Sequence, residues 1–165
     1  MAERNDLTTL LERLVVSGVE FVLVGGLAAV AQGAPISTFD VDVVHRRTPD
    51  NIERLLAFLD AVHARYRHRP GPALPIDRAT LLGPGHALFM TDLGPLDVLG
   101  AIEEGMDYDD LVPQSRSVEF SGATLRVLSL DTIVRLKRLS SDNKDKLRLP
   151  VLEEALRRSG GATRS

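Results

Sequence analysis

The chain contains no cysteine among its 165 residues, and this absence excludes several chemistries. A disulfide framework, a thiolate zinc site and a cysteine nucleophile all require that residue. Long apolar runs are also missing, since no stretch approaches the roughly 20 residues that a membrane-spanning helix needs. We therefore expect a protein with no membrane segment, and the lack of cysteine fits a cytoplasmic location.

Several common functional signatures are absent as well. The four histidines form no HExxH pattern and no paired ligand spacing, and Ser37 and Ser129 have no partner histidine pattern. The glycines match neither the GxGxxG dinucleotide pattern nor a Gly-Lys-Ser/Thr phosphate loop. We interpret the histidines as surface or local hydrogen-bonding residues. They are His45, His63, His68 and His86.

The remaining composition is that of an ordinary globular protein, with 44% hydrophobic residues, 26% charged residues and a net charge of −3. A chain of this length is most simply one domain, residues 1–165, and it is long enough to bury a real core. We expect a core over about residues 20–128 and a C-terminal helical part over about 129–158. Basic residues gather in 135–148, where a phosphate-binding patch and a solvated helix face both remain open.

Hydrophobic periodicity and turn residues predict the elements. Predicted helices cover about residues 7–17, 27–32, 49–62 and 130–139, and Asp6 is the predicted N-cap of the first one. A last helix begins near 142, with Pro150 expected to kink or restart it. Predicted strands cover about residues 20–24, 40–44, 87–91, 96–99, 117–120 and 124–128. The last four form two predicted hairpins, with turns at 92–94 and 121–122. Residues 66–86 are predicted to be mostly loop, with a short strand near Leu81. This order predicts an α+β domain with a mixed β-sheet flanked by helices and with C-terminal helices.

Two aspartates two residues apart on a predicted strand form the first candidate site. Asp40 and Asp42 point to one face of that strand, because successive side chains alternate. Such a pair suits a hard cation such as Mg²⁺, which prefers oxygen ligands. A third carboxylate on a neighbouring strand permits a second metal, and Asp97 is the best candidate. A solvated strand face is the alternative interpretation of the pair.

A double glycine lies where the first predicted strand meets the following helix. Gly25-Gly26 exposes backbone without side chains, so phosphate oxygens can approach the amide groups there. A plain tight turn is the alternative for this dipeptide alone.

These features together resemble the nucleotidyltransferase superfamily related to DNA polymerase beta. The resemblance rests on Gly25-Gly26, thirteen intervening residues, the Asp40-x-Asp42 pair and the later strand aspartate Asp97. It is greatest for the small prokaryotic members, which are the minimal nucleotidyltransferases and the relatives of the AbiEii-type toxins.

Three further elements extend the resemblance over about residues 20–155. Thr38 matches the hydroxyl residue that the family places before the aspartate pair. The helix that carries Lys137, and the Lys144-Asp145 pair that follows, are similar to the C-terminal elements of the small members. We therefore expect a nucleotidyltransferase-like sheet.

The resemblance implies a role for each matching residue. Asp40, Asp42 and Asp97 would be the catalytic residues and would bind Mg²⁺ or Mn²⁺. Nucleotide and phosphate contacts would come from Gly25, Gly26, Thr38, Lys137, Lys144 and Asp145.

The activity implied by the resemblance is Mg²⁺-dependent transfer of a nucleoside monophosphate from ATP or another NTP to a hydroxyl group. The acceptor could be tRNA, a protein side chain or a small molecule, and a toxin–antitoxin system with a cognate partner would suit the small size. Ile36 stands where many relatives carry an arginine, and Asp142-Asn143 replaces the usual arginine-proline. A catalytically inactive module that binds a nucleotide or partner with the same fold is therefore the alternative.

Overall fold

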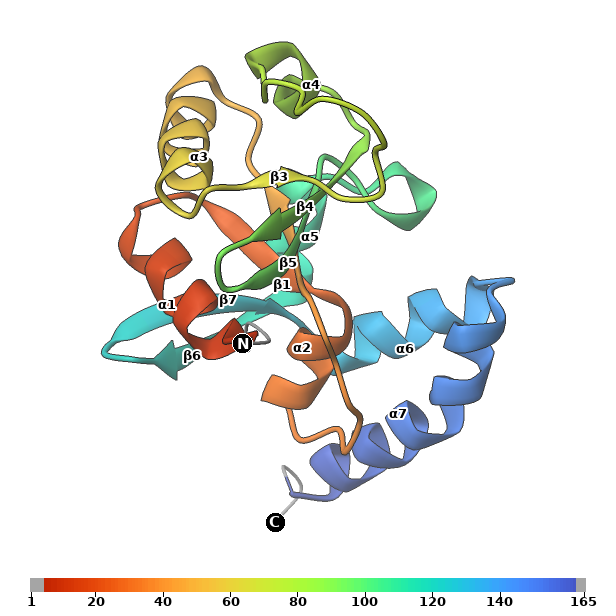
Figure 1. Cartoon of the computed structure of the whole chain (residues 1–165). Helices are drawn as coiled ribbons and strands as arrows, with labels where there is room; N and C mark the ends of the chain where they lie inside the picture. The colour runs from red at the N-terminus through yellow and green to blue at the C-terminus, as the bar shows by residue number, and fades with distance from the viewer. Residues whose placement is uncertain (1–4, 163–165) are drawn as a thin grey trace.

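One seven-stranded mixed β-sheet organises the computed structural model, and helices pack on both of its sides (Figure 1). The strands lie in the order β3-β4-β5-β2-β1-β7-β6. The structure describes residues 5–162, so residues 1–4 and 163–165 of the predicted domain 1–165 lie outside the described residues. The mixed sheet confirms the predicted α+β class, whereas the predicted division near residue 128 stays a prediction.

Six of the seven strands agree with the sequence pattern, and β3 was not predicted. The seven strands are β1 (Phe21–Val24), β2 (Val41–His45), β3 (Arg65–Tyr66), β4 (His86–Thr91), β5 (Gly94–Leu99), β6 (Ser115–Phe120) and β7 (Ala123–Leu128). Both predicted hairpins form, as the antiparallel pairs β4–β5 and β6–β7. The pairs β2–β5 and β1–β7 are parallel, whereas β1–β2 and β3–β4 are antiparallel.

The helices surround this sheet. They are α1 (Leu7–Val16), α2 (Gly25–Ala31), α3 (Pro49–Ala61), α4 (Arg78–Leu82), α5 (Tyr108–Leu111), α6 (Leu130–Leu139) and α7 (Asn143–Ala162), with short 3₁₀ turns at Glu103–Gly105 and Val112–Gln114. In Figure 1, α1 and α3 lie on one side of the sheet, and α6 and α7 lie on the other. The helix α2 packs on β1, β2 and β7 and against α6.

The core lies at the centre of the sheet, where β1 and β2 are neighbours. All four residues of β1 are buried, as a strand covered on both faces requires. The Asp6 carboxylate accepts the Thr9 N–H and caps α1, as the N-terminal pattern predicts. From that start, α1 places Leu10 and Leu14, both fully buried, in the core.

Three local expectations are corrected. Leu81 lies in α4, not in a strand, because Asp77 caps a helical turn and Leu81 buries its side chain from it. The helix α2 begins at Gly25 itself and not after the glycines. Finally, α7 is assigned as one helix through Pro150, so the chain does not restart there. Within residues 5–162, no helix combines the length and apolar character needed to cross a membrane.

Candidate active site

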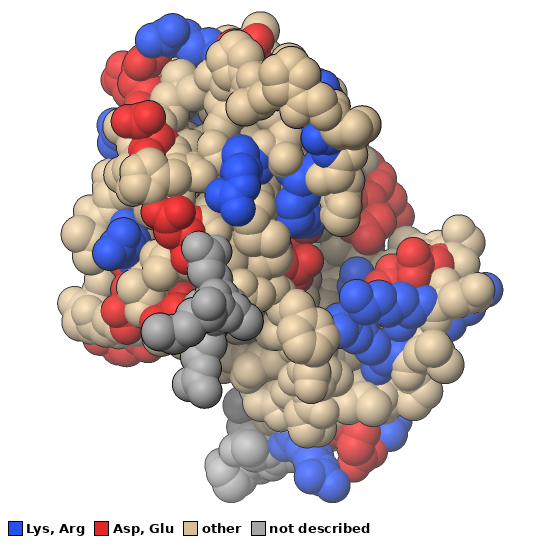
Figure 2. Space-filling model, in the orientation of Figure 1, with Lys and Arg blue, Asp and Glu red and all other residues tan. Residues whose placement is uncertain are grey.

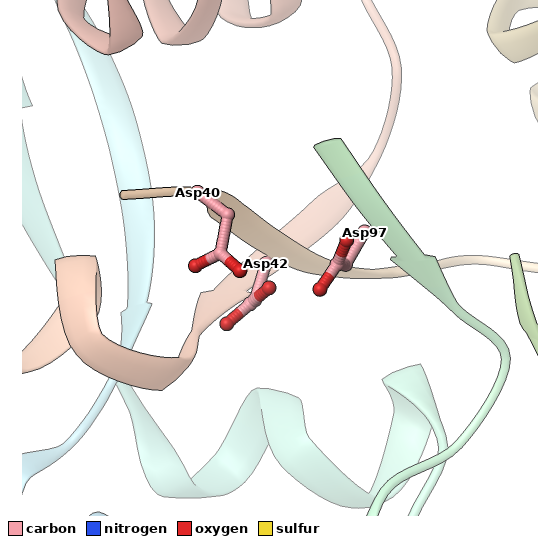
Figure 3. A group of neighbouring side chains, drawn as sticks. All are labelled: Asp40, Asp42 and Asp97. Atoms are coloured by element: carbon pink, nitrogen blue, oxygen red, sulfur yellow. The ribbon is translucent and has the colours of Figure 1, made fainter. Parts of the chain in front are cut away.

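Three carboxylates converge on one face of the sheet, and two of them belong to paired strands. The parallel pairing of β2 with β5 places Asp42 directly opposite Asp97, so both side chains leave the sheet on the same face. Asp40 precedes β2 and points toward the same space (Figure 3). One oxygen from each carboxylate lies within 4.8 Å of the other two, which is close enough for a shared cation.

The electrostatics of this cluster favour a bound cation. Burial, then a hydrogen bond with Asp97 and the charge of Asp40, raise the pKa of Asp42 to about 8. Burial and the charge of Asp97 also raise the pKa of Asp40. The Oδ1 atom of Asp42 is buried and has no hydrogen-bond partner. Three hard oxygen donors with an unpartnered buried atom fit a Mg²⁺ or Mn²⁺ ion.

Gly25 brings the backbone of β1 and α2 against these carboxylates. It has a φ of +71°, and a Cβ atom there would collide with the Oδ2 atom of Asp42. Only glycine combines that backbone conformation with such a close approach. The first turn of α2 therefore lies beside the acidic cluster.

Gly26 permits a second close approach, this time to the segment before β2. A Cβ atom on Gly26 would lie 2.9 Å from the Oγ1 atom of Thr38. That hydroxyl group lies 3.4 Å from the carbonyl oxygen of Asp40, to which it donates. Thr38 therefore links the glycine turn to the start of β2.

Basic side chains from α6 and α7 lie on one side of the carboxylates. The Nζ atom of Lys137 is 3.1 Å from Asp145, whose other oxygen accepts a 2.7 Å hydrogen bond from Ser140. Burial opposes ionisation of Asp145, but Ser140 and Lys137 outweigh it and lower its pKa. The charge of Lys144 favours ionisation of Asp40, which places Lys144 within electrostatic range of the cluster.

Arg148 belongs to the same side, although sequence reasoning did not select it as a site residue. Its Nη2 atom donates to the Ser37 carbonyl oxygen at 2.9 Å, and its charge acts on Asp40. Its Nη1 atom lies beside Gly26. A guanidinium group from α7 therefore lines the same cavity as Ile36. Its position within 135–148 was the only sequence signal.

Arg67 was also missed, and it lies on the opposite side of the carboxylates. It follows β3 and donates to Asp97 at 2.6 Å and to the Phe89 carbonyl oxygen at 2.6 Å. The side chains of Arg67 and Asp97 are both only 15% exposed, so this ion pair is largely shielded from water. Residues 66–86 were predicted to be mostly loop, and nothing local connects Arg67 with an aspartate thirty residues later.

Two cavities meet at the carboxylates. One of about 150 Å³ lies between the glycine turn and the basic residues of α6 and α7, and both Asp40 and Asp42 line it. A larger one of about 440 Å³ has mainly apolar walls that include Leu99, Ile133 and Leu136. Asp42 and Lys137 line both cavities, so a charged site opens directly into an apolar one.

The histidines take no part in the carboxylate cluster. His45 is buried and not a surface residue: it lies 2.7 Å from the Leu81 carbonyl oxygen through Nε2. Burial lowers the pKa of His45, which favours the neutral ring. His63 pairs with Asp92, and His86 contacts the Ala101 carbonyl oxygen at 2.8 Å. Each of these three histidines makes a hydrogen bond, but the partner lies 15 to 36 residues away in the chain.

No family model matches this sequence, and a search of curated proteins finds no match either. Solved structures are similar in fold. The lincosamide antibiotic adenylyltransferase LnuA, bound to lincomycin, aligns with a TM-score of 0.60 at 12% identity, over 90% of this chain and 95% of that one. The chain has the nucleotidyltransferase fold.

Two other solved structures have this fold as well. ANT(2")-Ia in complex with adenylyl-2"-tobramycin aligns with a TM-score of 0.55 at 15% identity, over 90% of this chain and 88% of that one. A candidate nucleotidyltransferase from Thermotoga maritima aligns with a TM-score of 0.53 at 19% identity, over 96% of this chain and 91% of that one. At these identities the likeness concerns the fold, so the activity has to be argued from the site.

Proposed function

We propose that this protein transfers a nucleoside monophosphate from an NTP to a hydroxyl group of an acceptor. The observation that carries the proposal is the convergence of Asp40, Asp42 and Asp97 beside the Gly25-Gly26 turn and a set of cations. Nucleotidyl transfer consists mainly of positioning and charge neutralisation, and this arrangement supplies both. The nucleotidyltransferase fold supports the same conclusion.

The three carboxylates would hold Mg²⁺ or Mn²⁺ on the site face of the sheet. A bound divalent cation would neutralise charge on the phosphates and on the attacking oxygen. Asp40 and Asp42 line the small cavity beside the glycine turn, so they suit a cation shared with the triphosphate. Asp97 lies farther along the sheet, beside Arg67, and suits the acceptor side.

The α6–α7 side of the site suits the triphosphate. Lys137, Lys144 and Arg148 line the 150 Å³ cavity with Gly25 and Gly26, so cations and side-chain-free backbone face one small space. Asp145 holds Lys137 in place through their ion pair. The apolar 440 Å³ cavity beyond Asp42 suits the nucleoside. It adjoins the 150 Å³ cavity proposed for the triphosphate, and its apolar walls can pack on a base.

The acceptor, the partner and the cellular location do not follow from the fold, and we give them as part of the proposal. LnuA and ANT(2")-Ia were crystallised with lincomycin and an adenylylated tobramycin respectively, so the fold serves small-molecule acceptors. A tRNA or protein acceptor, a toxin–antitoxin partner and a cytoplasmic location remain proposals that rest on the sequence resemblance.

Transfer of label from each of the four α-³²P-labelled NTPs, in Mg²⁺ and in Mn²⁺, tests the activity. Cell extract supplies the acceptors, and the labelled products are separated into nucleic acid, protein and small molecules. We expect label in one fraction with the wild type and none with Asp40→Asn/Asp42→Asn. Equal labelling by wild type and this variant would refute the proposal.

A binding module without turnover is the second candidate function. The shielded Arg67–Asp97 pair favours it, because Asp97 is already neutralised by a protein cation. Calorimetry that finds NTP·Mg²⁺ binding, together with no transfer to any extract fraction, would support this alternative over the enzyme.

A further inference from the structure

The apolar 440 Å³ cavity beside the carboxylates contains one acidic side chain from outside their cluster. Gly25, Asp42 and Lys137 line this cavity where it meets the proposed phosphate site. Glu103 lines it as well, from the Glu103–Gly105 turn that follows β5. A cavity of this volume is large enough for a nucleoside. The position of Glu103 relative to the phosphate side therefore determines which part of a nucleotide it meets.

The direction of β5 places Glu103 away from the phosphate side. Asp97 pairs with Asp42, and Leu99 follows two residues later on the same face, about 7 Å farther along the strand. His86 is the direct partner of Leu99 on β4, and both residues line the cavity. Beyond Leu99 the chain leaves the sheet and reaches Glu103. The cavity thus runs from the acidic cluster, past Leu99, to the Glu103 carboxylate.

Hydrogen bonds on both flanks hold the turn that carries Glu103. The His86 Nε2–H group donates to the Ala101 carbonyl oxygen at 2.8 Å, since a carbonyl can only accept. The Ile102 N–H donates to the Met106 carbonyl oxygen at 2.9 Å, which closes the turn around Glu103. The carboxylate is therefore carried by a closed turn that is tied to β4.

The Glu103 carboxylate has no charged partner of its own. Its neighbour Glu104 takes the nearby guanidinium group, with 3.8 Å between Glu104 and Arg135. Among residues 5–162, no ion pair involves Glu103. Figure 2 shows Asp and Glu atoms above a hollow, over the turn after β5, and Lys and Arg atoms below it, over α6 and α7. The phosphate end of the cavity is thus basic, and the opposite end is acidic.

We propose that the Glu103 carboxylate selects guanine and that GTP is the nucleotide that this protein binds and uses. This inference rests on the proposed nucleotidyl transfer. With the triphosphate beside Gly25, the base of the nucleotide points toward Glu103. A carboxylate only accepts hydrogen bonds. Guanine presents two adjacent donors on the edge farthest from its sugar, the N1–H and the 2-amino group, and they match the two oxygens of one carboxylate.

The other three bases fit a carboxylate less well. Adenine and cytosine each present one amino group beside a ring nitrogen that accepts, so a lone pair faces the second carboxylate oxygen. Uracil presents one N–H between two carbonyl oxygens. Leu99, Ile102 and Ile133 line the cavity and can pack on the faces of any base, so they add affinity without selecting among bases. Selection therefore falls to Glu103.

Calorimetric titration of the full-length chain with GTP, ITP and ATP, each in Mg²⁺, tests this assignment. The base of ITP is guanine without its 2-amino group, so ITP keeps only one of the two donors. Wild type is compared with Glu103→Gln. Glu104→Gln is the matched control, because Glu104 belongs to the same turn and pairs with Arg135.

We expect wild type and Glu104→Gln to bind GTP at least about tenfold more tightly than ITP or ATP, the value of one charge-assisted hydrogen bond. Glu103→Gln should lose about tenfold for GTP and gain affinity for ATP. A glutamine amide accepts from the adenine amino group and donates to the adjacent ring nitrogen. The melting temperatures of both variants should remain near wild type. A purely structural role of Glu103 would change the three affinities alike.

Two results would overturn the inference: wild type that binds ITP or ATP as tightly as GTP, or a Glu103→Gln variant that keeps the wild-type preference. Failure of the proposed function has a different signature. In that case GTP is bound selectively through Glu103, but no label passes from any NTP to an extract fraction. Wild type that binds no NTP would overturn both.

Discussion

The Oδ2 atom of Asp42 occupies the space that a Cβ atom on Gly25 would need. The first residue of α2 and the central carboxylate of the site are therefore fitted to each other. Since Gly25 also has a positive φ, any other residue there is strained before the clash is counted.

Gly25→Ala should consequently damage both stability and the site. We expect the free energy of unfolding to fall by about 1–3 kcal/mol, from backbone strain and from displacement of Asp42. Urea denaturation measures the first effect, and Mn²⁺ titration monitored by electron paramagnetic resonance measures the second.

Gly160→Ala is the control for this substitution. A Cβ atom on Gly160 meets nothing within 4 Å, and the residue lies in α7. Replacement of a helical glycine by alanine should leave the stability unchanged or slightly higher. Equal stability and equal Mn²⁺ binding in Gly25→Ala and wild type would contradict the geometry described here.

The stability of the metal-free protein should fall as pH rises. The pKa of Asp42 is about 8 in the folded protein and near its ordinary value of 3.8 in the unfolded chain. Between these values the folded state keeps a proton that the unfolded state has released. The free energy of unfolding therefore decreases from pH 4 toward pH 8 in EDTA.

Asp42→Asn should remove most of this decrease, because asparagine stays neutral. Between pH 5.5 and pH 8 we expect the variant to gain about 1–3 kcal/mol in stability relative to wild type, because only wild type must keep a proton on, or ionise, a buried carboxyl group beside Asp40 and Asp97. Asp60→Asn, at an exposed position of α3, should retain the wild-type pH dependence. Urea unfolding at pH 5.5 and pH 8 compares all three, and parallel pH profiles for wild type and Asp42→Asn would count against the raised pKa.

Metal binding should show the opposite pH dependence. A cation must displace the Asp42 proton, so the apparent affinity for Mn²⁺ should rise by roughly tenfold or more between pH 6.5 and pH 8. Isothermal titration in two buffers of different ionisation enthalpy detects the released proton. Saturating Mn²⁺ should also raise the melting temperature at pH 8, because the ion binds only the folded state. A pH-independent affinity would exclude Asp42 as a ligand.

Arg148 should contribute to NTP binding through its guanidinium group. We expect Arg148→Ala to weaken the affinity for NTP·Mg²⁺ by about tenfold, the value of one charge-assisted hydrogen bond. Arg157→Ala, which removes an exposed arginine of the same helix, should have no effect. Calorimetric titration compares them, and a larger loss in Arg157→Ala than in Arg148→Ala would contradict this assignment.

Local sequence accounts for most of the secondary structure. The Asp6 cap, the strand that ends at Val24 and the two hairpins are each determined by residues close together in the chain, and all of them are observed. The short strand expected near Leu81 was wrong because its burial signal was interpreted without the Asp77 cap, which produces a helical turn.

Some residues of the site could also be found from local sequence, whereas others could not. Alternation along one strand and a double glycine are local features, so Asp40, Asp42, Gly25 and Gly26 could be selected from sequence. Asp97 could be selected only as a candidate on another predicted strand, because the parallel pairing of β2 with β5 is what places it beside Asp42. No local pattern specifies which distant strand becomes a neighbour.

The sequence by itself determined most of the elements, the mixed α+β class and the alternation that points two aspartates to one side. The tertiary structure alone decided which cations surround them: Arg67 pairs with Asp97 from the sheet edge, and Arg148 reaches the glycine turn from α7. The physical reason is the sequence distance over which each kind of interaction acts. Periodicity and capping act over a few residues, whereas an ion pair or a buried carboxylate cluster depends on chain segments brought together when the sheet forms.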